Sequence, residues 1–428
     1  MKVLVLTHGS RGDVQPFAAL ARALDKAGHE VVLAGPAGSV DLAAPYCTRL
    51  VRLDEGTNRL VNDRDAWEAV ERNFRGWRGK LLGLAFLRRN RALMATVLDD
   101  LAVLADELAA GADGVDLVVH QVNVPGNAIA ERLGVPAVPV CLQPFWVPTS
   151  SFPDPTFPFP LPATFNRASY LATRLLVRAF SGSTAHWRRA RLGLPRRHGR
   201  QDVLRQPDGS PATVVQAFSR HLLPSPLSYP DHVRTVGFFF LPAPADWTPP
   251  PALSGFLADG APPVYLGFGS MVGSDPRRTG RVVSEAIGLA GVRAVVASGR
   301  GGVGSTRFGP NVFCLDQAPH DWLFPRMTAV VHHGGAGTTA AAVAAGRPQV
   351  VCPFMFDQAF FGRRAHQLGV APAPLPLRRL TAHDLAASIR TVVRQPEFAA
   401  RAEELGERVR SEDGTTSAVE ILESAWKR

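Results

Sequence analysis

The sequence predicts an α/β protein with two parallel-sheet domains that face each other across a cleft. Apolar strand-like runs alternate with helical segments in residues 1–140 and again after residue 260, which is the pattern of βαβ units. A proline-rich stretch, LPAPADWTPPPAL (241–253), separates these regions and has the composition of a semi-rigid linker. The chain has 428 residues, enough for two domains that each bury a full core.

In the first half, strands are expected at 3–7, 30–35, 116–121 and 136–143. The apolar spacing of Phe17, Leu20, Ala21 and Leu24 predicts an amphipathic helix over 16–27. Further helices are expected near 90–110 and near 127–133.

Residues 144–165, PFWVPTSSFPDPTFPFPLPATF, are rich in proline and phenylalanine and should form no regular element. A loop of this length inside a compact domain is usually functional. Its aromatic side chains either line an apolar pocket or pack a surface excursion onto the core, and the sequence leaves both alternatives open.

In the second half, strands are expected at 264–270, 293–299, 311–316, 329–335 and 348–354. They are nearly continuous apolar runs, as expected when both faces of a parallel sheet are covered. A final helix from 396 to 426 should be interrupted near Asp413 and Gly414. The predicted divisions are a first domain over 1–237, a linker over 238–252, a second domain over 253–405 and a last helix over 406–428 that packs back on the first domain.

Composition limits the class of protein. No apolar run reaches the ~18 residues of a membrane-spanning helix, and the N-terminus has no signal-peptide pattern, so a cytoplasmic protein is expected. The four cysteines are far apart and are expected to be buried thiols. The net charge is +10, but its arginines are dispersed. This favours attraction to anionic nucleotides, or peripheral contact with membrane lipids, over nucleic-acid binding.

The segment HHGGAGTT (332–339) follows a strand and opens an alanine-rich helix. Its glycines allow the backbone to approach a ligand closely. The N–H groups of Gly337, Thr338 and Thr339 are expected to point outward at the positive end of the helix dipole, which suits a phosphate or pyrophosphate. His333 adds an N–H donor. A tight glycine turn with a buried histidine is the structural alternative.

Other polar side chains stand at strand ends, where open parallel sheets bind ligands. Asp357 and Gln358 follow the last strand and present acceptors and a donor to vicinal hydroxyls; a plain N-cap role for Asp357 is the alternative. Ser270 ends a strand where a phosphate oxygen fits. His320 follows another strand, where a nucleobase would extend.

The first strand leads into GSRGDVQP (9–16), which places Arg11 and Asp13 where a dinucleotide fold would carry GxGxxG. The absence of that fingerprint disfavours a NAD-dependent dehydrogenase. An aspartate near the start of a helix is favoured in its ionised form by the helix dipole. The turn therefore supplies both a positive group and a carboxylate.

Together, GSRGDVQP, PHDWLFP (319–325), HHGGAGTT and the Asp357–Gln358 pair resemble the motifs of inverting, nucleotide-sugar-dependent glycosyltransferases of the UDP-glycosyltransferase superfamily. The resemblance spans both halves and is nearest to the sterol glucosyltransferase and bacterial natural-product branch. It implies the GT-B fold, with two Rossmann-like domains. The first would bind the acceptor and the second the nucleotide sugar.

The resemblance makes Asp13 the catalytic base, at a position where plant relatives carry histidine. His8 or His120 could assist it, and each is equally a hydrogen-bonded structural histidine. The expected donor site comprises Ser10, Arg11, Gly12, Ser270, Ala318, His333, Gly335, Gly337, Thr338, Asp357 and Gln358. The expected acceptor site comprises Phe145, Trp146, Phe152, Phe157, Phe159 and His120.

Two positions differ from those of the relatives, and they leave open which nucleobase the donor carries. Gln317 stands where plant members have tryptophan, and Arg300 stands where the sterol branch often has one. The implied donor is UDP-glucose or a dTDP-deoxysugar, and the implied acceptor is an apolar alcohol such as a sterol, polyketide or macrolide. The protein would be a monomer or a homodimer.

No metal or other cofactor is implied, because the nucleotide sugar is a co-substrate and a helix terminus with a histidine meets its phosphates. Asp63, Arg64 and Asp65 form a DxD triplet, but it lies away from any strong strand. Two rival functions stay open. One is a nucleotide-sugar epimerase of the same architecture, and the other is a basic nucleic-acid-binding protein.

Overall fold

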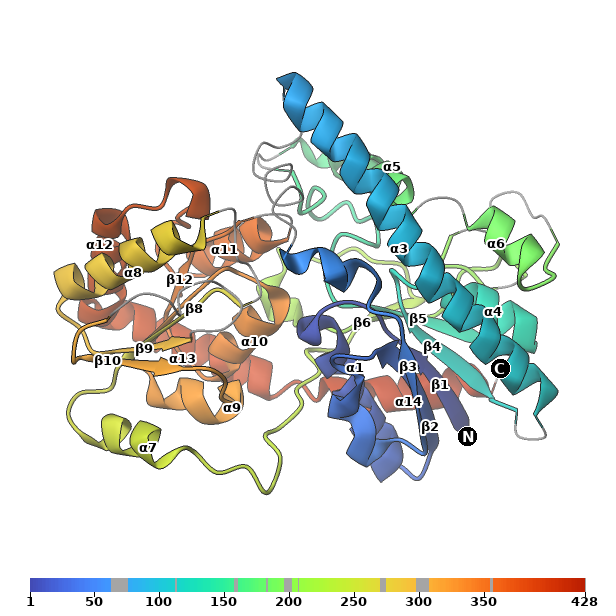
Figure 1. Ribbon diagram of the computed structural model, residues 1–428, viewed down its shortest axis with the longest axis horizontal. Helices are drawn as coiled ribbons and strands as arrows, with labels where there is room; N and C mark the ends of the chain where they lie inside the picture. The colour runs from blue at the N-terminus through green and yellow to red at the C-terminus, as the bar shows by residue number, and fades with distance from the viewer. Residues whose placement is uncertain are drawn as a thin grey trace.

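Two parallel sheets with flanking helices form the protein, as predicted (Figure 1). The computed structural model describes residues 1–62, 76–111, 114–157, 161–181, 184–195, 202–206, 208–269, 275–297, 308–354 and 357–427. In the described residues the first sheet has seven strands and the second has five.

The first sheet has the order β3-β2-β1-β4-β5-β6-β7, and every neighbouring pair is parallel. Its strands are β1 (Lys2–Leu6), β2 (Glu30–Pro36), β3 (Arg49–Leu53), β4 (Leu117–Gln121), β5 (Ala137–Cys141), β6 (Val214–Gln216) and β7 (Val233–Thr235). Its helices are α1 (Arg11–Lys26), α3 (Gly76–Ala110), α4 (Gly126–Leu133), α5 (Ala163–Ser181) and α6 (Ala185–Ala190). The four predicted strands are confirmed, whereas β3, β6 and β7 were not predicted.

Strand β1 shows why these runs are continuously apolar. Val3 and Val5 pack into a core with α1, while Leu4 and Leu6 pack on the opposite face against α3 and α4. Each residue is buried, because alternate side chains of a strand enter opposite layers. The sheet therefore requires hydrophobic residues at every position of its central strands.

The second sheet has the order β10-β9-β8-β11-β12 and is also parallel. Its strands are β8 (Val264–Gly267), β9 (Ala294–Ala297), β10 (Val312–Leu315), β11 (Ala329–His332) and β12 (Gln349–Val351). Its helices are α7 (Pro251–Ala258), α8 (Pro276–Ala290), α9 (His320–Leu323), α10 (Ala336–Ala344), α11 (Gln358–Gln367), α12 (Ala382–Arg394) and α13 (Pro396–Arg410). All five predicted strands are present.

The last helix, α14 (Gly414–Trp426), returns to the first sheet (Figure 1). Ala418, Val419 and Leu422 belong to the core that also holds residues of α1, and Glu423 Oε1 lies 2.9 Å from His29 Nε2. Asp413 caps α14 by accepting from Thr416 N–H. The break expected near residue 413 thus separates two helices that pack on different sheets.

Both sheets have a point where the strand order reverses, between β1 and β4 in the first and between β8 and β11 in the second. Chains leave neighbouring strands in opposite directions there, which opens a crevice at the carboxyl edge of the sheet. Leu6 pairs with His120 at the first reversal and Gly267 pairs with His332 at the second. Asp13 and Gln121 follow the first pair of positions in the chain, and His333 follows the second.

No helix among the described residues is long and apolar enough to cross a membrane.

Candidate active site

Asp13 lies in the first turn of α1, not in a loop that precedes the helix. The helix begins at Arg11 rather than at residue 16, and Ser10 is its N-cap. Asp13 Oδ2 accepts from Ser10 N–H at 2.8 Å and from the Ser10 hydroxyl at 3.0 Å. This is the reciprocal contact of a capping box, in which the side chain at the third helical position binds the N-cap backbone.

Gly9 makes room for the Asp13 carboxylate. Its φ is +142°, which only glycine adopts readily. A Cβ at this position would lie 2.4 Å from Asp13 Oδ2. The glycine of the GSRGD motif is therefore required by the carboxylate that follows it.

The second oxygen of Asp13 contacts Gln121 at the end of β4. Gln121 Nε2 donates to Asp13 Oδ1 at 3.0 Å. Gln121 Oε1 accepts from the Thr7 hydroxyl at 2.8 Å and from His8 N–H at 3.3 Å, so its amide is oriented by β1 and aimed at the carboxylate. Gln121 is not predictable from the sequence, because only the adjacency of β1 and β4 brings it to Asp13.

The two histidines expected near Asp13 have other hydrogen-bond partners. His8 Nε2 lies 3.1 Å from the Asp54 carbonyl oxygen, and burial lowers the pKa of this imidazole although Asp13 acts in the opposite direction. His120 is fully buried, its Nδ1 lies 3.1 Å from the Gln121 carbonyl oxygen, and burial lowers its pKa to about 4. Both imidazoles are therefore held neutral near pH 7.

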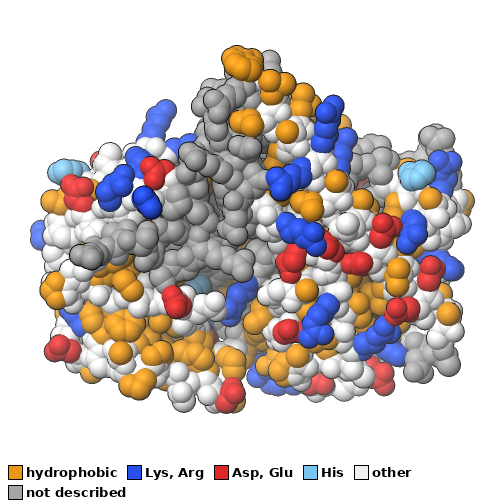
Figure 2. All heavy atoms as spheres, viewed as in Figure 1, with side chains coloured by type: hydrophobic (Ala, Val, Ile, Leu, Met, Phe, Trp, Pro, Cys, Tyr) orange, Lys and Arg blue, Asp and Glu red, His pale blue; other side chains and the backbone are white. Residues whose placement is uncertain are grey.

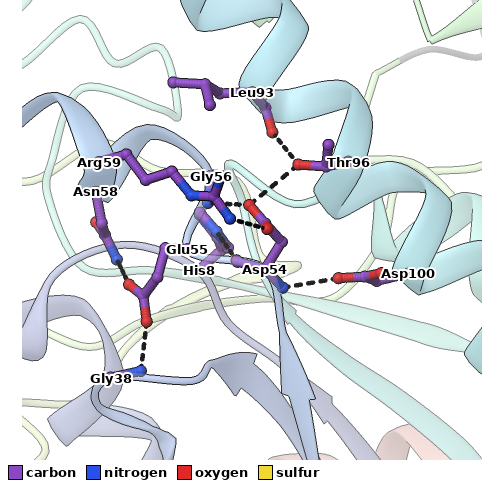
Figure 3. Close-up of polar contacts among 10 residues, drawn as sticks. All are labelled: His8, Gly38, Asp54, Glu55, Gly56, Asn58, Arg59, Leu93, Thr96 and Asp100. Atoms are coloured by element: carbon purple, nitrogen blue, oxygen red, sulfur yellow. Dashed lines mark hydrogen bonds and ion pairs between the residues drawn. The ribbon is translucent and has the colours of Figure 1, made fainter.

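A cluster of polar residues around Asp54 and His8 holds the loop that follows β3 (Figure 3). Asp54 N–H donates to Asp100 of α3 at 2.7 Å, and Asp54 Oδ1 accepts from the Thr96 hydroxyl at 3.1 Å. Asn58 Nδ2 donates to the Gly9 carbonyl oxygen at 2.7 Å. The loop after β3 is thereby tied to α3 on one side and to the turn before Asp13 on the other.

Burial raises the pKa of Asp13, and hydrogen bonds from Ser10 and Gln121 together with His8 offset part of this rise. A carboxylate that is partly desolvated binds a proton more readily than one in water. The site therefore increases the basicity of Asp13 while fixing its orientation.

The HHGGAGTT segment forms the turn before α10. Gly335 is the N-cap and Thr339 N–H donates to the Gly335 carbonyl oxygen at 2.9 Å. The expectation of a free Thr339 N–H was wrong, because the first intrahelical bond already uses it. Ala336, Gly337 and Thr338 occupy the first three helical positions, whose N–H groups have no intrahelical acceptor, and none of the three donates to another backbone group in the described part of the chain.

His333 lies against two glycines at the reversal point of the second sheet. A Cβ on Gly335 would lie 2.5 Å from His333 Nε2, and one on Gly269 would lie 3.0 Å from His333 Cε1. Burial lowers the pKa of His333 to about 4. Its Nδ1 is buried and has no hydrogen-bond partner among the described residues. A neutral ring with an unpartnered buried nitrogen thus lies beside the terminus of α10.

The preceding residue, His332, holds the backbone of the turn through hydrogen bonds. His332 Nε2 lies 2.8 Å from Gln349 Oε1, and Gly334 N–H donates to His332 Nδ1 at 3.0 Å. The ring therefore holds the turn in which Gly334 has a φ of +89°. His332 and His333 are adjacent in sequence, but their rings contact different residues.

Asp357 is the N-cap residue of α11, but its side chain makes no capping hydrogen bond. Burial raises its pKa to about 7, and the negative charge of Asp13 adds to the rise. The two carboxylates, one from each half of the chain, are therefore close enough to interact electrostatically. Gln358 Oε1 accepts from Phe354 N–H at 2.8 Å, so that oxygen orders the preceding loop.

Arg11 crosses between the halves. Its Nη1 donates to Gln317 Oε1 at 2.9 Å, and its charge contributes to the lowered pKa of His320, after burial. Gln317 and the partly buried Ala318 follow β10. Arg11 thus reaches the second sheet from the same turn that carries Asp13, while Gly12 is exposed between them.

The aromatic loop packs in part against the second half of the chain, which is one of the two alternatives that the sequence left open. Phe152 is buried, and its ring centroid lies 5.9 Å from that of Phe360 in α11. Phe145 and Trp146 are only partly buried, with ring centroids 5.0 Å apart. The carbonyl oxygen of the partly buried Phe157 accepts from an Arg363 side chain at 3.1 Å. Part of the loop is interdomain core, and part stays accessible.

Several expected residues lie outside the described part of the chain. These are Ser270, Phe159, Arg300 and the triplet Asp63, Arg64 and Asp65. In the described ranges, no three His, Cys, Asp or Glu side chains are grouped so that they could hold a metal ion.

Two family models match the chain. The N-terminal domain of glycosyltransferase family 28 matches residues 3–72, and the C-terminal domain of erythromycin biosynthesis protein CIII-like proteins matches residues 292–424.

Curated relatives match nearly the whole chain. O-mycaminosyltylonolide 6-deoxyallosyltransferase of Streptomyces fradiae is 34% identical over 99% of this chain and 97% of its own length. A sterol 3-beta-glucosyltransferase of Arabidopsis thaliana is 32% identical over 99% of this chain and 68% of its own length. The sterol 3-beta-glucosyltransferase of Emericella nidulans is 34% identical, and the chain spans only 30% of that relative's length.

Solved structures share the fold. The glycosyltransferase of kitacinnamycin superposes with a TM-score of 0.69 at 20% identity, covering 99% of both chains. The glycosyltransferase VinC, solved in complex with dTDP, superposes with a TM-score of 0.66 at 20% identity over 100% of both chains.

Proposed function

This chain belongs to the glycosyltransferases of the UDP-glycosyltransferase superfamily, and from that premise we propose that it transfers a sugar from a nucleoside diphosphate sugar to a hydroxyl of an apolar acceptor. UDP-glucose or a dTDP-deoxysugar is the donor, and a sterol, polyketide, macrolide or similar alcohol is the acceptor. The relatives are sterol glucosyltransferases and a macrolide glycosyltransferase, which favours this function over the epimerase.

One observation carries the proposal. The turn that holds Asp13 reaches the second sheet through Arg11 and Gln317, and Asp13 is close enough to Asp357 to raise its pKa. We infer that this carboxylate, with its raised basicity, faces the helix terminus, His333 and Asp357 of the other domain. This arrangement suits a proton acceptor for an alcohol opposite a site for an anionic leaving group.

In the proposed reaction the acceptor oxygen attacks the anomeric carbon as the bond from that carbon to the diphosphate oxygen breaks. The hydroxyl proton passes to Asp13, and the nucleoside diphosphate leaves with its added negative charge. The N–H groups at the start of α10 and the His333 ring stabilise that charge. Attack from the face opposite the leaving group inverts the anomeric centre. Asp357 and Gln358 are placed to bind sugar hydroxyls.

We expect sugar transfer to proceed without a divalent ion, because a helix terminus and a histidine are the proposed partners of the diphosphate. Transfer measured after exhaustive EDTA treatment should match that of the untreated enzyme. Addition of magnesium or manganese should change the rate little. Loss of activity in EDTA and its return with manganese would contradict the proposed phosphate site.

We expect the best acceptors to be fused-ring or macrocyclic alcohols. Phe145 and Trp146 offer partly exposed aromatic surface on the aromatic loop, and burial of apolar surface is favourable by ~25 cal/mol per Å². A matrix of UDP- and dTDP-sugars against polycyclic alcohols, with products read by mass spectrometry, tests this. Fast turnover of free hexoses together with no turnover of any apolar alcohol would refute the acceptor assignment.

A further inference from the structure

The most exposed large hydrophobic side chains of the described residues lie on two helices, α3 and α5. The six most exposed large hydrophobic side chains among the described residues are 55% to 77% exposed, and all lie on these two helices. We name them the α3–α5 tip; they are Trp77, Leu81, Leu84, Phe165, Leu171 and Leu175. Single exposed apolar residues need no explanation, but six gathered on two neighbouring helices do.

The tip does not contribute to the core of the first sheet. Helix α3 has 35 residues, and the large side chains that it buries in the described range run only from Val97 to Leu108. Its first turns project beyond the sheet, next to α5 (Figure 1). Trp77, Leu81 and Leu84 are spaced i, i+4 and i+7, so they share one helix face.

The charged residues of the two helix segments that carry the tip are all basic. Residues 76–98 contain five Lys or Arg and no Asp or Glu, and residues 163–181 contain three Arg and no Asp or Glu. Arg88 and Arg167 are exposed, whereas Arg174 pairs with Asp202 at 2.6 Å. Hydrophobic and basic side chains gather along the projecting end of α3 (Figure 2). A projecting surface with a tryptophan, leucines and arginines is complementary to an anionic lipid surface.

The buried side of α5 holds the aromatic loop. Asn166 Nδ2 donates to the Ser150 carbonyl oxygen at 2.9 Å, and the Ser169 hydroxyl accepts from Asp154 N–H at 2.8 Å. Tyr170 is fully buried on the same helix. One face of α5 therefore anchors residues 150–154, while Leu171 and Leu175 face outward.

We propose that the α3–α5 tip binds the surface of an anionic bilayer and brings the acceptor loop to it, so that an apolar acceptor enters from the membrane. The second part rests on the proposed function, and the first does not. A second copy of the chain is a poor occupant, because two basic tips would bring like charges together.

Flotation of the full chain with vesicles tests the proposal. The protein should float with phosphatidylcholine vesicles that contain phosphatidylglycerol, bind pure phosphatidylcholine far more weakly, and be released by salt. Leu81→Glu with Leu84→Glu should lower the partition at least ~10-fold, and Arg88→Glu with Arg167→Glu should do so on the anionic vesicles. Leu289→Glu, at an exposed leucine of α8 on the other half, is the matched control and should float as the parent does.

Brominated lipids give a local readout. They should quench part of the tryptophan fluorescence of the parent, and Trp77→Phe should remove that part. The proposal is overturned if the parent does not float, if Leu289→Glu loses binding equally, or if the tip variants instead abolish self-association in vesicle-free solution. Transfer to a detergent-dispersed acceptor, measured in parallel, separates the two proposals: tip variants should retain it, and a parent that floats but transfers no sugar refutes only the proposed function.

Discussion

Asp13→Asn should lower the rate of sugar transfer by ~10²–10⁴, the usual cost of losing a general base. The substitution keeps the size of the side chain and removes its ability to take the hydroxyl proton. Nucleotide affinity, read by calorimetry, should stay near that of the parent. Near-parental turnover would show that Asp13 is not the base.

The hydrogen bonds of Asp13 suggest a double variant that separates its role as a base from its role in holding the turn. Asp13 accepts from Ser10 on one oxygen and from Gln121 on the other, so an asparagine that keeps the Ser10 contact turns its NH₂ toward the Gln121 NH₂. Adding Gln121→Glu restores an acceptor there, and Thr7 and His8 N–H can still donate to it. The double variant should recover thermal stability but not turnover. Recovery of both would mean that Asp13 acts through the structure of the turn.

The pH profile tests the same assignment. Burial raises the pKa of Asp13 above the ordinary range of an aspartate, and only its ionised form accepts a proton. Turnover should therefore fall as the pH drops through this raised pKa, and recover as the pH rises. Asp13→Asn should lose this limb of the profile along with its activity. A limb that persists in the variant would belong to another group.

His333→Ala should weaken the binding of UDP or dTDP by ~1–3 kcal/mol, the range for a lost hydrogen bond to a charged group. The buried Nδ1 of His333 has no partner among the described residues, and the ring lies beside the start of α10. His383→Ala, at an exposed histidine of α12, is the control for loss of an imidazole. Unchanged affinity on calorimetry would remove His333 from the phosphate site.

We expect the affinity for the nucleotide to increase as the pH falls. The free ring has a pKa lowered to about 4 by burial, and a bound diphosphate would favour its protonated form and raise that pKa. Affinity should therefore increase as the pH falls toward the raised value, and His333→Ala should flatten this increase. An equal increase in the variant would assign the effect to another group.

The sequence predicts nine of the twelve described strands, and most of these, such as β1 and β4, are apolar runs buried on both faces. It missed β3, whose pattern RLVRL places charged residues on an edge strand, and the short strands β6 and β7 at the other end of the sheet. The start of α1 was misplaced because the apolar spacing that predicted the helix begins only at Phe17. The pattern Ser10-x-x-Asp13 was present and is a capping signal.

The candidate site was predictable where its residues are close in sequence and missed where the sheet assembles them. The turn before α10 could be read from its glycines, whereas the Asp13–Gln121 and Arg11–Gln317 contacts join residues more than 100 positions apart. Their distance in sequence leaves no local pattern. These two contacts depend on which strands are neighbours at the reversal point and on how the two domains face each other.

The return of α14 to the first sheet has a consequence for synthesis on the ribosome. Ala418, Val419 and Leu422 complete the hydrophobic layer over α1, yet they are translated after the entire second domain. Until they emerge, the nascent first domain exposes the part of that layer that α14 will cover. Domains that are otherwise ready to fold early in translation are held incomplete by such a segment, and chaperone engagement should therefore persist until it is released.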